Sequence, residues 1–137
     1  MCCIIVLAAS SCTKQEVISP TTTNRTIFFT IKGGSAGWQS NTDANGSVSY
    51  TSALAGGQLP EIDAAFQANG AVLVYISFDN GTTYEAVPEV YGGTAYSYTH
   101  SVGNVTIYAQ SPNGSSAVLP ASDALIKIVL VDSNSSK

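Results

Sequence analysis

Charged residues are scarce in this chain of 137 residues. Lys and Arg together number five, Asp and Glu number nine, and the formal net charge is −4. No run of basic residues is present, and binding to nucleic acid requires a positively charged surface. The composition therefore argues against a nucleic acid as partner, and the length is typical of one domain.

Cysteine is absent from all but the start of the chain. The three cysteines are Cys2, Cys3 and Cys12, so residues 13–137 hold none. A disulfide within a domain formed by that part is excluded, and so is a structural zinc site built on thiolates. Such a domain must be stabilised by its apolar core alone.

The residue patterns of an active site are also missing. The single histidine, His100, ends an expected strand, and no Gly-x-Ser-x-Gly motif is present. Glu85 and Glu89 are the nearest pair of acids, and we expect solvated charges on a turn rather than a glycosidase pair. We therefore predict a non-catalytic protein without a cofactor. A carbohydrate-active enzyme is the weakest alternative, which a cleft joining His100 to Glu85 or Glu89 would favour.

The first twelve residues carry the clearest functional signal. An apolar run over 2–9 leads into Ala9-Ser10-Ser11 and then Cys12. This order is typical of a lipoprotein signal peptide over 1–11, cleaved before an acylated Cys12, and the run is too short to span a bilayer. No Lys or Arg precedes Cys12, which favours a start upstream of Met1. The prediction is an outer-membrane lipoprotein, periplasmic or surface-exposed, whose partner is the membrane; the alternative is an N-terminal strand with an unmodified cysteine.

Residues 12–25 are predicted to form a flexible tether, because they are polar and contain Pro20 and a run of threonines. The tether ends at Arg25, the only arginine. A second hypothesis follows from that residue: proteolysis after Arg25, as in lipoprotein pilins, would make the chain a filament subunit that assembles by strand addition. A long unpaired edge or a deep groove would favour this hypothesis.

The remainder, 26–133, predicts an all-β domain, with a short tail over 134–137. Seven β-branched or alternating segments are expected to be strands, and one segment with apolar residues at helical spacing, 60–69, a helix. The run 71–78 is expected to be a central strand buried on both faces, and 35–47 a loop. These elements predict an antiparallel β-sandwich, immunoglobulin-like or jelly-roll-like. The expected strands are 26–32, 48–51, 71–78, 82–87, 95–100, 104–110 and 124–131.

Aromatic residues are the best candidates for ligand contacts. Trp38, Tyr84, Tyr91, Tyr96 and Tyr98 fall in or near loops and short strands. Exposed tyrosine and tryptophan rings stack on sugars or on partner side chains, so a shared exposed face would bind a glycan or a protein. The alternative is that these rings cover the core and the edge strands.

A weak calcium motif lies at Asn41, Asp43, Asn45 and Gly46. Oxygen ligands at alternate positions before a glycine are typical of a calcium loop. Position twelve is Ser52 rather than a bidentate glutamate, so we favour an ordinary Asx-type turn and predict no metal site.

Several positions between Trp38 and Asp132 follow one pattern: Trp38, 62–70, 72–75, Pro88, 103–107, and Lys127 where the pattern has an Arg. With these positions, residues 38–132 resemble a small β-domain of secreted proteins and lipoproteins of Bacteroidota. The usual Ile-Pro-Gly ending of that family is replaced by 131–133. The resemblance implies a cell-envelope or secreted β-domain and no catalytic residues. It agrees with a cell-envelope lipoprotein that serves as a non-catalytic binding or structural module.

Overall fold

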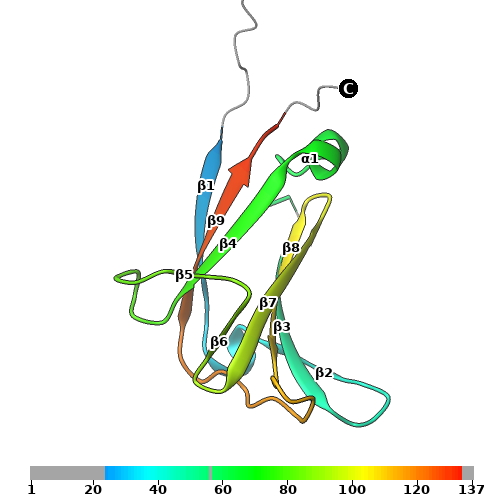
Figure 1. The fold of residues 1–137 in the computed structure, drawn as a ribbon, viewed down its shortest axis with the longest axis vertical. Coiled ribbons are helices and arrows are strands. Elements are labelled where there is room, and N and C mark those ends of the chain that lie inside the picture. The colour runs from blue at the N-terminus through cyan, green and yellow to red at the C-terminus, as the bar shows by residue number, and fades with distance from the viewer. Residues whose placement is uncertain (1–23, 56, 134–137) are drawn as a thin grey trace, which may run out of the picture.

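The computed structural model describes residues 24–55 and 57–133. Two antiparallel sheets face each other in this part of the chain, with one short helix at one end (Figure 1). One sheet has the order β1-β9-β4-β5 and the other β2-β3-β8-β7-β6. The strands are β1 (Arg25–Ile31), β2 (Gln39–Thr42), β3 (Val48–Leu54), β4 (Ala71–Ser77), β5 (Glu85–Ala86), β6 (Glu89–Tyr91), β7 (Thr94–Ser101), β8 (Asn104–Gln110) and β9 (Ala124–Val131).

The predicted all-β antiparallel sandwich is confirmed, with nine strands instead of about seven. The first additional strand is β2, which lies within the predicted loop 35–47 together with η1, a 3₁₀ turn (Gly34–Ala36). All four residues of β2 are exposed and polar, so the strand has no apolar alternation. The second is β6, which has three residues and begins just after Pro88.

Strand β9 shows how the sequence pattern builds the core. Ile126, Ile128 and Leu130 are buried between the sheets, and the residues between them point outward and are half-buried. This is the alternation that a strand with one covered face requires. The predicted strand 124–131 is confirmed with the same bounds.

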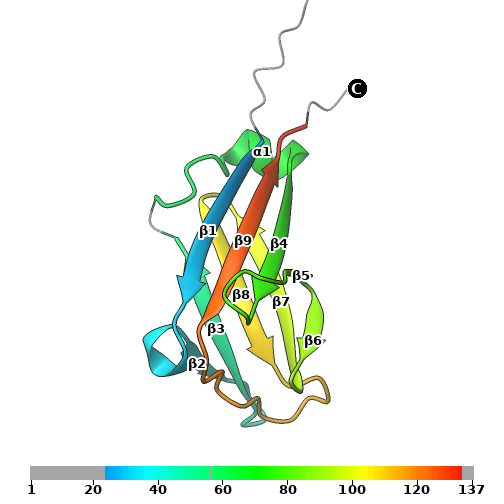
Figure 2. The same cartoon turned by 90° about the vertical axis from the view of Figure 1, so that its left-hand side faces the viewer.

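Strand β4 does not follow its prediction. Val72, Val74 and Ile76 are buried, but Leu73 is 42 % exposed and Tyr75 is half-buried. The prediction of burial on both faces is wrong, because no second layer covers the outer side of this sheet in the described residues (Figure 2). The outer face of the sheet is therefore apolar yet open.

Helix α1 (Ala64–Asn69) is shorter than the predicted 60–69. Asp63 is its N-cap and accepts a hydrogen bond at 2.8 Å from the backbone N–H of Phe66. Leu59 and Ile62 are buried in the turn that precedes the helix. The helical spacing of the apolar residues thus comes from a turn followed by a helix, and the predicted stop at Asn69 is confirmed.

Strand β1 begins at Arg25, one residue earlier than predicted. Arg25 pairs with Leu130 in the register of the sheet and forms an ion pair with Glu61. It therefore belongs to the folded domain and not to a tether. The predicted signal peptide 1–11, Cys12, residues 13–23 of the tether and the tail 134–137 lie outside the described residues. In the part of the chain that the structure describes, no helix has the length and apolar character needed to cross a membrane.

Candidate functional site

Two of the five aromatic candidates are core residues. Trp38 is 3 % exposed and Tyr96 is 5 % exposed, and their ring centroids lie 6.3 Å apart. Burial raises the pKa of the Tyr96 hydroxyl. The prediction that these two side chains contact a ligand from an exposed face is wrong, because the space between the sheets encloses both rings.

The other three candidates are separated from one another. Tyr98 is half-buried, and its hydroxyl donates a hydrogen bond at 2.6 Å to the carbonyl of Val72 in the opposite sheet. Tyr91 stacks on Phe78 with ring centroids 4.2 Å apart. Tyr84 lies on the outer face of the first sheet, with its ring centroid 6.3 Å from that of Phe28. The expected single aromatic patch does not form.

Tyr91 and Phe78 line a cavity of about 350 Å³ beside the 118–122 segment. Tyr91 is 47 % exposed and Val118 is 80 % exposed. This cavity is smaller than the groove described below, and it is bordered by the end of β6, the start of β7 and the 118–122 segment.

The calcium candidate is a hairpin turn between β2 and β3. The carboxylate oxygen Oδ1 of Asp43 accepts hydrogen bonds from the backbone N–H groups of Asn45 and Ser47, at 2.8 and 2.9 Å. The side chain of Asn41 donates to the hydroxyl of Thr51 at 2.9 Å. Asp43 thus forms the Asx-type turn that the sequence analysis favoured. In the described part of the chain, no three His, Cys, Asp or Glu side chains form a group suited to a metal ion.

His100 lies apart from the acids that an enzyme would need beside it. Its Nδ1 atom is 2.9 Å from Oε1 of Gln67 on α1. Glu89 of β6 pairs with Tyr96 of β7. Tyr96 precedes His100 by four residues on that strand. A strand rises about 3.3 Å per residue, which separates the two positions by about 13 Å.

Glu85 and Glu89 come together, although the sequence left their geometry open. Burial, a hydrogen bond that the protonated carboxyl of Glu89 donates to Glu85, and the negative charge of Glu85 raise the pKa of Glu89 to about 7. Two carboxyl groups in hydrogen-bond contact are closer than the about 5 Å or more that separates the acids of a glycosidase. The pair does not match that catalytic geometry.

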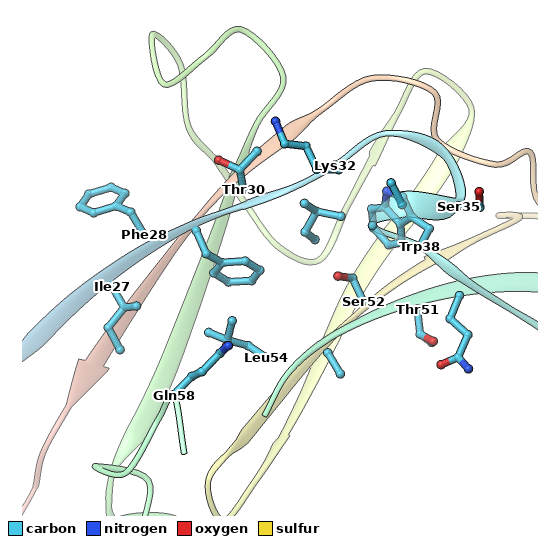
Figure 3. Close-up of a pocket in the computed structure, with 16 residues that line it drawn as sticks. Ile27, Phe28, Thr30, Lys32, Ser35, Trp38, Thr51, Ser52, Leu54 and Gln58 are labelled. Atoms are coloured by element: carbon cyan, nitrogen blue, oxygen red, sulfur yellow. The ribbon is translucent and has the colours of Figure 1, made fainter. Parts of the chain in front are cut away.

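A groove of about 1020 Å³ lies between β1 and β3. Ile27, Phe29 and Leu54 line it and pack partly buried against the core. Figure 3 shows Trp38 near η1 at one end of this space, and Ile27 and Leu54 projecting from the two strands. The groove therefore has apolar walls built from side chains that the core covers only in part.

Both walls of the groove are strand edges. Strand β1 pairs with β9 on one side, and no other described strand pairs with it. Residues 52–54 of β3 pair with β8, whereas β2 covers only Val48 to Thr51. Backbone groups at such edges are free to pair with a further strand.

The interior of strand β1 lacks the usual protection of an edge. Natural edge strands carry a proline, a lysine, an inward charge or a bulge that prevents pairing with other chains. The residues from Thr26 to Ile31 include none of these, and the pairing with β9 runs without a bulge. Charge is confined to Arg25 at the start of the strand and to Lys32 just after its end. The sequence showed this feature, but it did not show that β1 is an edge.

The indole N–H of Trp38 is an unsatisfied donor within the core. Its Nε1 atom is buried and has no hydrogen-bond partner among the described residues. Buried N–H groups of this kind are normally paired. Because this atom is buried, the features that the groove offers to a ligand are its open strand edges and its half-buried apolar side chains.

Comparisons with protein-family models, with curated proteins and with solved structures find no match to this chain. The similarity to the Bacteroidota β-domain stays a prediction.

Proposed function

We propose that this chain is a non-catalytic module of the cell envelope that binds an extended segment of another protein in the groove between β1 and β3. The observation that carries the proposal is the pair of facing strand edges, which enclose an apolar groove of about 1020 Å³. An added strand would receive hydrogen bonds from backbone groups and specificity from side chains at alternate positions.

The apolar walls favour a partner segment with apolar residues at every second position. Ile27 and Phe29 point toward the core side of β1, and Leu54 does so on β3. Side chains of an inserted strand that point the same way would cover these three residues. Each apolar side chain buried in this manner contributes about 1.5–3 kcal/mol before the cost of ordering the segment.

The shape of the groove favours a free segment over the edge of a second folded sandwich. The η1 turn and the chain that follows β3 both project past the edge of β1 (Figure 2). A whole sheet approaching this edge would meet both projections, while a single strand passes between them. Strand β1 has seven residues, so the bound segment spans about 23 Å.

Attachment to the envelope is supported by the sequence. The apolar run before Cys12 and the small residues beside it favour a lipid anchor on Cys12, and the similarity to Bacteroidota lipoproteins agrees with an outer-membrane location. A lipid-anchored module would hold its groove close to the membrane, where its partners would be other envelope proteins.

Photo-crosslinking in the native envelope tests the proposal. A photoreactive amino acid replaces Gln58, an exposed residue that lines the groove. The matched control carries it at Val118, which is 80 % exposed and lies away from the groove. We expect an adduct specific to position 58, and mass spectrometry should identify an extended segment of another protein with alternating apolar residues.

A synthetic peptide of the crosslinked sequence then provides the binding measurement. It should raise the melting temperature of the chain in a concentration-dependent manner. Leu54→Ser should weaken binding of the peptide, and Leu73→Ser, at a 42 % exposed position on the outer face of β4 that does not line the groove, should not. A groove adduct from a second copy of this chain would favour the filament subunit instead, and the absence of a position-specific adduct would contradict both.

The groove is compatible with the filament hypothesis, but the position of Arg25 in the fold does not favour cleavage there. Arg25 is the first residue of β1, pairs with Leu130 and contacts Glu61. Proteolysis after Arg25 would require that end of β1 to open. We therefore rank a donor segment from another protein ahead of one from a second copy.

A further inference from the structure

A second surface lies on the outer face of the β1-β9-β4-β5 sheet, separate from the groove. Phe28, Lys127 and Tyr75 stand opposite one another on three adjacent strands. The ring of Tyr84 lies beside Phe28. These four side chains form one row across the sheet, which we call the aromatic row.

Lys127 is the only charged side chain among the outward positions of these three strands. Its Nζ atom lies 4.5 Å from the ring centroid of Tyr75 and 4.3 Å from that of Tyr84. An ammonium group held between two rings is stabilised by cation–π attraction, which fixes its position. The outer face therefore holds one cation at a defined place.

The ammonium group of Lys127 can form further hydrogen bonds. It offers three hydrogen-bond donors. Among the described residues, the ion pairs are Arg25 with Glu61 and Lys32 with Asp123, and Lys127 is in neither. Lys127 is half-buried in an apolar surface, so an anion that reached it would bind in a partly desolvated place, where charge-assisted hydrogen bonds are strong.

The surroundings of Lys127 match the chemistry of a sugar. Phe28 is 57 % exposed, so one ring is available for stacking against the C–H face of a pyranose. Thr26 and Thr30 lie two residues away on either side, and both are exposed. They supply hydroxyl groups to the same face, as the tyrosines do. Adjacent strands are about 4.8 Å apart, so the row spans about 10 Å, the length of a short oligosaccharide.

We propose that the aromatic row binds an acidic oligosaccharide, with a sugar ring on Phe28 and a carboxylate on Lys127. A face-to-face contact with a second copy is disfavoured, because it would bring one Lys127 toward the other. This site uses the outer face of β1, whereas the groove uses its inner face and its edge. The two sites can therefore be tested separately.

Calorimetric titration of the folded chain with tetragalacturonate tests the proposal. The comparison ligand is the methyl ester of the same oligosaccharide, which keeps the rings and removes the charge. We expect tetragalacturonate to bind and the ester to bind at least about tenfold more weakly, as the loss of a charge-assisted hydrogen bond requires.

Variants locate the site. Lys127→Met and Phe28→Ala should each lower the affinity for tetragalacturonate at least about tenfold, if hydrogen bonding and stacking both contribute. Lys32→Met is the matched control, because Lys32 is an exposed cation paired with Asp123 at 2.8 Å, away from the row. It should leave the affinity unchanged, and the melting temperature of each variant confirms its folding.

Three outcomes would overturn the proposal. The first is a failure of tetragalacturonate to bind, and the second is equal binding of its ester. The third is equal binding of hexaglutamate, which would identify a protein-binding or general anion surface instead of a sugar site.

Discussion

At the residue scale, the aromatic side chains divide by burial rather than by position in the sequence. Trp38 and Tyr96 are enclosed between the sheets, whereas Phe28 and Tyr91 are exposed. Aromatic residues are frequent in strands whether their rings pack in the core or contact a ligand. Composition alone therefore does not separate core rings from ligand-binding rings. Burial assigns Tyr96 to the core and leaves Phe28 available to a ligand.

This division predicts different costs for two tyrosine substitutions. Tyr96→Ala should lower the free energy of unfolding by about 3–5 kcal/mol, the usual cost of deleting a buried aromatic ring. Tyr91→Ala is the matched control, since its ring is 47 % exposed and stacks only on the half-buried Phe78. Urea unfolding measures both, and equal losses for the two variants would contradict the assignment.

Glu89 predicts the pH dependence of stability. Its pKa of about 7 in the folded chain lies above its ordinary value of 4.5, so the folded state binds the proton more tightly. Stability should therefore fall as the pH rises from about 4.5 to about 7, and this contribution should be constant above that range.

Glu89→Gln removes the titrating group and should flatten this part of the profile. Thermal unfolding at several pH values measures the effect. Asp79 provides the contrast, since the backbone N–H of Thr83 and the hydroxyl of Ser77 lower its pKa. Its contribution is lost only as the pH falls below 3.8. Identical profiles for wild type and Glu89→Gln between pH 4.5 and 7 would contradict the raised pKa of Glu89.

At the scale of elements, the pattern of the sequence determines some strands and not others. The predicted strands 95–100, 104–110 and 124–131 correspond to β7, β8 and β9. Strand β2 has no apolar residue, so it carries no such pattern, and its pairing with β3 alone makes it a strand. The apolar run 71–78 led to the wrong prediction of burial on both faces, because the outer face of β4 is apolar but is not covered.

The candidate site depends on information that no local pattern contains. Residues 26–32 were correctly predicted to form a strand. That β1 lies at an edge, and that this edge faces residues 52–54 of β3, follows from the strand order of two sheets. The close approach of Glu85 and Glu89 is likewise set by the chain between β5 and β6. Topology therefore decides both features.

Helix α1 gives a test of the capping interpretation. Asp63→Ala should destabilise the chain by about 1 kcal/mol, because the N–H of Phe66 loses its acceptor at the helix start. Asp63→Asn keeps an oxygen at the same place and should cost less. Chemical denaturation compares the two, and an unchanged midpoint for Asp63→Ala would show that the cap does not contribute.

At the scale of the whole molecule, two surfaces of the same sheet are exposed in the part of the chain that the structure describes. The edge of β1 opens on the groove, and the outer face carries the aromatic row. The buried residues lie between the two sheets, so a ligand on either surface need not disturb the core. The proposed module would then present one site for a protein segment and another for a sugar.

The central claim is that a partner segment pairs with the edge of β1. Amide hydrogen exchange tests it most directly, measured on the chain with and without the synthetic peptide of the crosslinked sequence. The account predicts slower exchange over Thr26–Ile31 and over 52–54, with no change at β6, the edge of the second sheet. Slower exchange at β6 or in the 118–122 segment, with β1 unchanged, would contradict it.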